Sequence, residues 1–179
     1  LDGRDELRLA ERLSGVGPDL PLKILFIVPY APTRIRTRPF PLIRALAAEQ
    51  HRVTLATLWT NDAEREAVES LAGELDQVCS PRIRLGRSVW NCLRALPGRS
   101  PLQAAYSWSP ALARGTSRLV KDAGFDAIHV EHLRGARYGL SVQPVLKKTG
   151  RSRPALVWDS VDCISTLFRQ AASEARTRR

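Results

Sequence analysis

The sequence of 179 residues contains no methionine, only three cysteines and no hydrophobic run long enough to cross a bilayer. The longest apolar segment, residues 24–31, is interrupted by Pro29, and the charged first twenty residues do not resemble a signal peptide. The cysteines, Cys79, Cys92 and Cys163, are widely spaced and form no CxxC pair. This spacing favours reduced structural thiols over a disulfide framework or a metal site, and we expect a cytoplasmic protein.

Both ends of the chain lack the usual boundary signals. The first residue is Leu1 rather than methionine, and residues 174–179 have a helix-forming composition without a terminating glycine or proline. We therefore expect a fragment, with residues 1–20 as a charged leader outside the core. Residues 21–179 have a length that suits one domain.

Acidic residues are absent between Asp76 and Asp122, although the whole chain carries a net charge of +10. A field of one sign favours an anionic partner, such as a lipid headgroup, a phosphate or a nucleic acid. The alternative is a solvated arginine-rich surface. Trp90, Tyr106 and Trp108 lie in the same stretch, and aromatics among basic residues suit a membrane surface or single-stranded nucleic acid. For Trp90 we expect a place in the core instead. The basic residues of this stretch are Arg82, Arg84, Arg87, Arg94, Arg99, Arg114, Arg118 and Lys121.

Short apolar segments alternate with helical patterns along the chain. The run KILFIVPY has no polar alternation beyond its first residue, which indicates a strand buried on both faces, as in a parallel sheet. The alternation predicts an α/β protein with a Rossmann-like, doubly wound, mainly parallel sheet and helices on both faces. We expect strands at 23–30, 53–59, 82–85, 127–131 and 155–159. Helices are expected from Pro41, at 63–75, 88–96, 101–121 with a break at Pro110, and 161–176, with a loop or short helix at 138–148.

The loop after the first strand contains no glycine. A dinucleotide site or a P-loop needs glycines for close approach of the backbone to phosphate, so both kinds of site are excluded here. Arg34, Arg36 and Arg38 occupy the loop instead, and in an extended segment they fall on one side. Guanidinium groups bind phosphate or carboxylate, which favours a ligand role over a merely solvated loop.

Chemically active side chains follow the predicted strand ends, where ligands bind in such sheets. His129 and Glu131 fall on one face of their strand, and with the adjacent His132 they can transfer protons. Arg134 follows closely, and Asp159 ends the last strand. His129 can equally be a hydrogen-bonded core histidine. A metal site is disfavoured because two histidines and a glutamate at this spacing do not face one point.

Four segments in this order, KILFIVPYAPT, LIRALAAEQHRVTLATL, FDAIHVEHLRGARYGL and ALVWDSVD, resemble the N-terminal domain of glycosyltransferase family 4. The similarity covers roughly residues 21–179 and is strongest to sugar transferases of bacterial exopolysaccharide and exosortase systems. It implies two Rossmann-like domains around a cleft (GT-B). The N-terminal domain binds a sugar or lipid-linked acceptor, the C-terminal domain binds the sugar nucleotide donor, and no metal or other cofactor is obligatory.

The resemblance also implies roles for individual residues. Residues 30–38, from Tyr30 to Arg38, correspond to the acceptor loop, although the usual glycine is missing. The HVEH segment corresponds to the family's histidine that faces the reaction centre, and Asp159 lines the cleft. The donor-binding domain is not in these residues, so we expect this chain alone to bind acceptor weakly and to transfer no sugar.

Two other readings remain open. The chain can be a non-enzymatic module that binds an anionic membrane or polymer through residues 77–121, or an α/β enzyme with a small phosphorylated ligand. No nucleic-acid-binding module is present, and we expect no nucleic-acid partner. We expect a location in the cytoplasm, peripheral to the inner face of the plasma membrane.

Overall fold

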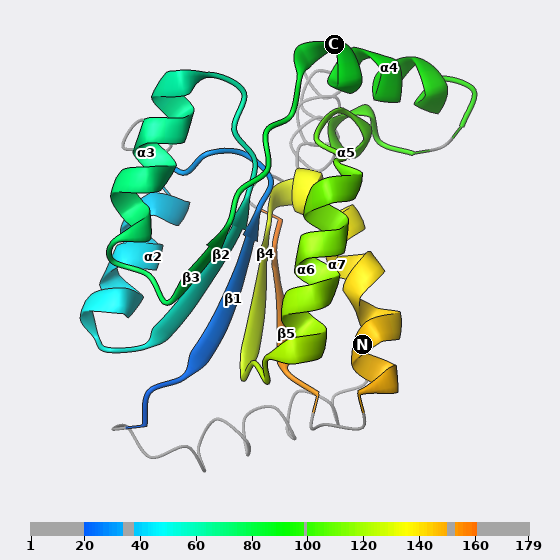
Figure 1. Ribbon diagram of the computed structural model, residues 1–179. Coiled ribbons are helices and arrows are strands. Elements are labelled where there is room, and N and C mark those ends of the chain that lie inside the picture. The colour runs from blue at the N-terminus through cyan, green and yellow to red at the C-terminus, as the bar shows by residue number, and fades with distance from the viewer. Residues whose placement is uncertain (1–19, 34–37, 99, 150–152, 161–179) are drawn as a thin grey trace, which may run out of the picture.

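The structure is a computed structural model that describes residues 20–33, 38–98, 100–149 and 153–160 (Figure 1). Residues 1–19 of the expected leader lie outside the described residues. The same holds for Arg34 and Arg36 and for the helix predicted at 161–176.

Five parallel strands form one sheet in the order β3-β2-β1-β4-β5. The strands are β1 (Lys23–Val28), β2 (Arg52–Thr57), β3 (Gln77–Cys79), β4 (Ala127–Glu131) and β5 (Ala155–Asp159). The chain first moves outward from β1 to β3 and then returns to the other side of β1. The strand order therefore reverses between β1 and β4, and the expected Rossmann-like, doubly wound α/β fold is confirmed.

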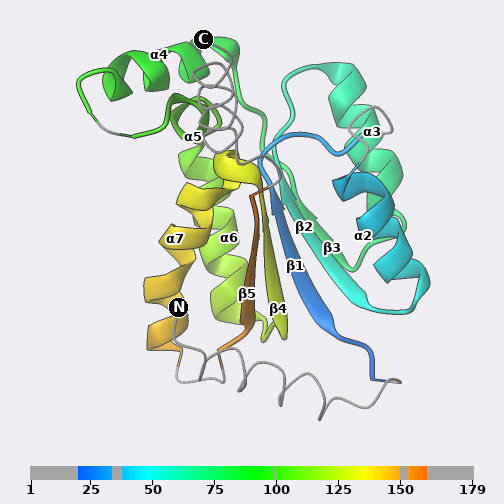
Figure 2. The same cartoon turned by 180° about the vertical axis from the view of Figure 1, so that it is seen from behind.

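Helices cover both faces of the sheet, α2 (Pro39–Ala48) and α3 (Asp62–Ala72) on one face, α6 (Pro110–Asp122) and α7 (His132–Lys148) on the other (Figures 1 and 2). Strand β1 contributes to both cores. Phe26 packs in the cluster of Ile43 and Leu71, whereas Ile27 packs in the cluster of Leu112. Burial on both faces explains why this strand shows no polar alternation in sequence.

Two glycines of α7 face the sheet and allow the helix to pack closely on β4. A Cβ added at Gly135 would lie 2.9 Å from Val130 Cγ1, and one at Gly139 would lie 3.0 Å from Val130 Cγ2. The helix starts directly after β4, whereas the sequence predicted only a loop or short helix at 138–148. Glycine spacing and the internal Pro144 weakened the helical pattern, but close packing on β4 outweighs both effects.

Most other predicted elements are confirmed. Helix α3 is capped as expected, since Glu64 N donates to Asn61 Oδ1 at 2.9 Å. Pro110 separates α5 (Leu102–Tyr106) from α6. The strand predicted at 82–85 is wrong: Arg82 makes a single bridge to Trp59, and the strand of this region is β3.

Helix α4 (Leu85–Ala95) and α5 lie beyond the carboxyl ends of the strands (Figures 1 and 2). Trp90 on α4 is 55% exposed, so its predicted place in the core is wrong. Trp108 packs against the core, with its ring 4.9 Å from that of Tyr138. Within the described part of the chain, no helix has the length and apolar character needed to span a membrane.

Candidate functional site at the carboxyl ends of the strands

His129 and Glu131 form a buried pair near the carboxyl end of β4. Their side chains share one face of the strand, as the two-residue period predicts, and His129 Nε2 lies 3.1 Å from Glu131 Oε2. The His129 side chain is 12% exposed and that of Glu131 is 3% exposed. The histidine ring also packs on Phe26, with centroids 4.7 Å apart. A buried carboxylate without partners would be costly, and this pairing offsets the cost.

Tyr30 supplies a second partner to the buried carboxylate. It follows the carboxyl end of β1, the strand next to β4, and its hydroxyl donates to Glu131 Oε1 at 3.3 Å. The guanidinium of Arg134, in the first turn of α7, lies 5.9 Å from the centre of the Tyr30 ring. Each oxygen of the Glu131 carboxylate thus has a partner: Oε2 contacts His129 of β4, and Oε1 contacts Tyr30, which follows β1.

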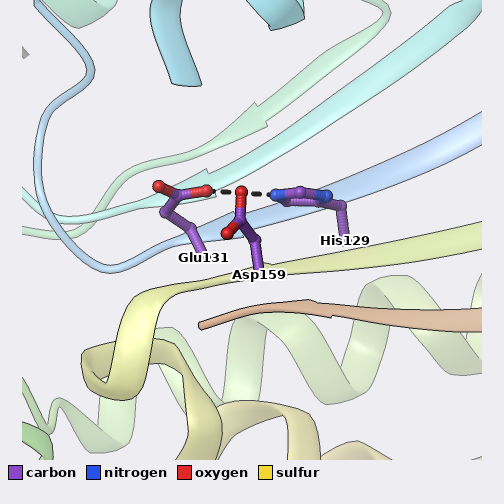
Figure 3. A group of neighbouring side chains, drawn as sticks. All are labelled: His129, Glu131 and Asp159. Carbon is purple, nitrogen blue, oxygen red and sulfur yellow. Dashed lines mark hydrogen bonds and ion pairs between the residues drawn. The ribbon is translucent and has the colours of Figure 1, made fainter. Parts of the chain in front are cut away.

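Asp159 adds a second carboxylate beside the pair. Its position in β5 is in register with Glu131 in β4, so both side chains fall on the same face of the sheet. Figure 3 shows the side chains of His129, Glu131 and Asp159 converging above the strands. Asp159 Oδ2 accepts a hydrogen bond from Arg38 Nη2 at 2.9 Å. This ion pair connects the start of α2 to β5 across the site.

His132 makes the sharp turn between β4 and α7. Its backbone has φ of 59°, in the left-handed region that residues other than glycine seldom adopt. The His132 ring accepts a hydrogen bond at Nδ1 from Arg134 N at 3.4 Å, and its carbonyl accepts one from Trp158 Nε1 at 3.4 Å. The contact with Arg134 N holds the His132 imidazole at the start of α7, and the histidine that contacts Glu131 is His129.

The three converging side chains also offer ligands for a cation. One ligand atom each from His129, Glu131 and Asp159 lies within 4.8 Å of the other two. The sequence disfavoured a metal site made of His129, Glu131 and His132. The group found here contains Asp159 in place of His132. A cation here would compete with Arg38 for Asp159 and with the Tyr30 hydroxyl for Glu131. The arrangement as it stands, a histidine–carboxylate pair beside an arginine–carboxylate ion pair, suits proton transfer and hydrogen bonding to hydroxyl groups.

A cavity of about 260 Å³ opens beside Tyr30 and Arg134, which belong to its lining. The hydrogen bond from the Tyr30 hydroxyl to Glu131 Oε1 connects this cavity to the pair, neither member of which lines it. The remaining lining residues come from the strand ends and from α3, α4 and α5. They are Pro29, Leu58, Thr60, Glu64, Ile83, Ser88, Tyr106 and Ser107.

Tyr138 fixes one wall of this cavity. Its hydroxyl donates to Ser107 O at 2.6 Å and accepts a hydrogen bond from Ser109 N at 2.6 Å. Burial raises the pKa of the Tyr138 phenol, while the hydrogen bond from Ser109 and the charge of Arg137 oppose this effect. The phenol therefore holds the connection between α5 and α6 in place as a neutral group.

The structure brings together most of the residues that the sequence proposed for the site. Tyr30, Glu131 and His129 form one hydrogen-bonded group, and Arg38 and Asp159 form an ion pair beside it. Arg134 lies over the Tyr30 ring at the border of the site. Sequence reasoning did not propose the cavity residues Thr60, Glu64, Ser88 and Ser107. The position of Thr60 just after β2 was a signal that could have identified it.

Comparisons with protein families, with curated proteins and with solved structures find no match to this chain. Its fold class is therefore assigned from its own architecture, a doubly wound parallel sheet with helices on both faces. A fold of this class hosts many activities, so a functional assignment depends on the chemistry of the residues around Glu131.

Proposed function

We propose that this chain is the acceptor-binding half of a sugar-nucleotide-dependent glycosyltransferase that builds a bacterial polysaccharide or glycoconjugate. The observation that carries the proposal is the buried His129–Glu131 pair, with 3.1 Å between Nε2 and Oε2, beside the point where the strand order reverses. Ligands of doubly wound sheets bind at this point. The order of the four sequence segments that resemble family 4 gives independent support.

The pair suits the activation of a hydroxyl group. In the proposed reaction, an acceptor hydroxyl oxygen attacks the anomeric carbon of the sugar nucleotide, the bond from that carbon to the phosphate oxygen breaks, and the nucleoside diphosphate leaves. The hydroxyl proton passes to the His129–Glu131 pair. The Glu131 carboxylate orients the imidazole ring of His129 and compensates the charge that the ring gains when it accepts the proton.

The surrounding polar groups suit recognition of the acceptor. Arg38 and Asp159 offer a donor and an acceptor at the edge of the site, and both retain exposed surface, 57% and 24% of their side chains. Such groups match the hydroxyls of a sugar or the phosphate of a lipid-linked sugar. Arg34 and Arg36, close to Arg38 in sequence, add positive charge for an anionic acceptor. The sugar nucleotide would be bound mainly by a second domain.

Acceptor binding can be tested through the three histidines of this chain. Their imidazole NMR signals are assigned with the variants His51→Asn, His129→Asn and His132→Asn. Farnesyl pyrophosphoryl glucose, a short lipid-linked sugar, is then titrated into the unmodified chain. We expect the His129 signal to shift and the His51 signal to stay unchanged, because His51 lies beside Leu22 at the other end of the sheet.

Glucose 1-phosphate and farnesyl pyrophosphate serve as partial ligands in parallel titrations. Recognition of a sugar acceptor predicts a larger shift of the His129 signal with the complete ligand than with either part. Equal shifts with farnesyl pyrophosphate alone would contradict sugar recognition. Unchanged His129 signals up to millimolar ligand would contradict acceptor binding at this site.

A further inference from the structure

Helix α4 exposes a continuous apolar face at the carboxyl end of the sheet. Of its eleven residues, all of which the structure describes, only Ser88 is buried. Leu85 is 67% exposed, Trp90 55% and Leu93 54%. Surface helices of globular proteins usually bury their apolar side, so this exposed side of α4 is a candidate docking surface. The exposed apolar residues are Leu85, Val89, Trp90 and Leu93, continued after the helix by Leu96.

The order of residues around the helix separates three faces. With about 100° of rotation per residue, Leu85, Val89 and Leu93 fall within an arc of about 80°, and Trp90 lies about 60° beyond Leu93. Arg87 and Arg94 follow on the far side of Trp90. The remaining side meets α5 and the loop after it, where Asn91 Nδ2 donates to Trp108 O at 2.7 Å and Cys92 Sγ lies 3.8 Å from Leu102 O.

We propose that the exposed face of α4 docks on a membrane that contains anionic lipid. An apolar stripe bordered by tryptophan and arginine is the arrangement of helices that lie in the plane of a bilayer interface. The leucines enter the acyl boundary, Trp90 lies at headgroup level, and Arg87 and Arg94 contact lipid phosphates. This inference does not depend on the proposed transferase activity.

Charge favours a bilayer over a second copy of the chain. Residues 77–121 contain no acid, so two copies meeting through α4 would bring Arg87 and Arg94 of each against the other. Such like-charge contacts oppose association, and the net charge of +10 adds to the repulsion. The same charges attract a surface that carries phosphatidylglycerol.

The structure also places six basic residues of the stretch in two separate groups. Arg84, Arg87 and Arg94 belong to α4 or its cap, whereas Arg114, Arg118 and Lys121 belong to α6, which runs along the sheet (Figure 1). Of these residues, Arg87 and Arg94 flank the apolar face. Ser88 of α4 and Tyr106 of α5 line the cavity that reaches Tyr30. Docking through α4 would therefore bring the cavity close to the lipid headgroups.

Gly86 allows a clean test, because a Cβ added there meets nothing within 4 Å. Its position lies on the apolar face, so Gly86→Glu adds a negative charge to this face without removing a contact. Gly86→Gln is the neutral control of the same size. Binding of the full 179-residue chain is measured by co-sedimentation with vesicles of phosphatidylcholine, with and without one third phosphatidylglycerol.

We expect binding to the anionic vesicles, weaker binding to pure phosphatidylcholine, and a decrease with added salt. Gly86→Glu and the double variant Leu85→Glu/Leu93→Glu should lower the partition coefficient at least roughly tenfold. Gly86→Gln and Leu140→Glu, which changes a leucine with 64% exposure on α7, should change it less than about twofold. Circular dichroism melting curves are recorded as a control that each variant is folded.

Two further variants separate local docking from diffuse charge. Arg87→Glu/Arg94→Glu should lower binding much more than Lys147→Glu/Lys148→Glu, which makes the same charge change at the last turn of α7. Trp90→Phe should retain binding but abolish most of the blue shift in tryptophan fluorescence. Equal losses in both charge variants, unchanged binding of Gly86→Glu, or absence of binding by the unmodified chain would overturn the proposal. Self-association through α4 without vesicle binding would also overturn it and would make this face an interface between copies.

Discussion

His129 and Glu131 lie two positions apart on β4, with 3.1 Å between Nε2 and Oε2, and the Glu131 carboxylate is almost completely shielded from water. A charge in such a place must be held by its neighbours. The partners of this carboxylate are the His129 imidazole of β4 and the hydroxyl of Tyr30, which follows β1. The site therefore depends on the register of the two central strands.

Removing the Tyr30 hydroxyl should destabilise the protein. In Tyr30→Phe, Glu131 Oε1 loses a hydrogen-bond donor at 3.3 Å while its side chain stays buried. We expect the free energy of unfolding to fall by about 1–2 kcal/mol, measured by urea denaturation. Tyr106→Phe, at an exposed tyrosine of α5, is the matched control and should change it by less than about 0.5 kcal/mol. Equal effects of the two variants would contradict the assigned contact.

The Arg38–Asp159 ion pair should contribute little to stability and more to ligand binding. Because the Arg38 side chain is 57% exposed, a double-mutant cycle with Arg38→Ala and Asp159→Ala should give a coupling energy below about 1 kcal/mol. The coupling should decrease at high salt, as measured by urea denaturation in both conditions. A coupling of several kcal/mol, independent of salt, would show that the pair is a structural element of the core instead.

The backbone of His132 should restrict which residues can replace it. Its φ of 59° suits glycine and asparagine but strains a β-branched residue. We expect His132→Val to lower the free energy of unfolding by about 1–2 kcal/mol, whereas His132→Gly and His132→Asn should be close to neutral. Thermal and urea unfolding test this order, and an unchanged stability of His132→Val would contradict it.

Gly115 of α6 should be required because Cys79 occupies the space beside it. A Cβ added at Gly115 would collide with Cys79 Sγ, so Gly115→Ala should destabilise the protein by about 1–2 kcal/mol. In a Cys79→Ala background the same substitution should be neutral or stabilising by up to about 1 kcal/mol, because alanine favours the helix. A purely local effect on α6 would instead give the same change in both backgrounds. The unfolding free energies of the four proteins decide between these outcomes.

The sequence predicted the central strands and several site residues because their signals are local. A continuous apolar run identified β1, short segments rich in strand-forming residues identified β4 and β5, and the two-residue period placed His129 and Glu131 on one face. Strand β3 was missed because it has three residues, only one of which, Val78, is a strong strand former. The start of α7 was missed because its glycines serve packing against Val130, which no local pattern reveals.

Contacts between distant residues could not be predicted in the same way. The Tyr30–Glu131 contact joins residues 101 positions apart, and the Arg38–Asp159 pair joins residues 121 positions apart. Both follow from the order of strands in the sheet, which depends on tertiary packing. Trp90 was misplaced because the helical pattern of α4 indicates an apolar face without indicating whether the fold covers that face.

The central claim is tested most directly by sugar transfer in the complete protein encoded by the reading frame that contains this chain. Membranes with the protein are incubated with radiolabelled nucleotide sugars, and label in the lipid extract and polymer is counted. We predict transfer by the complete protein and none by the 179-residue chain alone. His129→Ala and Glu131→Gln should lower kcat by about 10²–10⁴-fold, whereas Glu69→Gln, on the exposed surface of α3, should leave it unchanged. Absence of transfer with every nucleotide sugar, clear transfer by this chain alone, or full activity of both site variants would contradict the account.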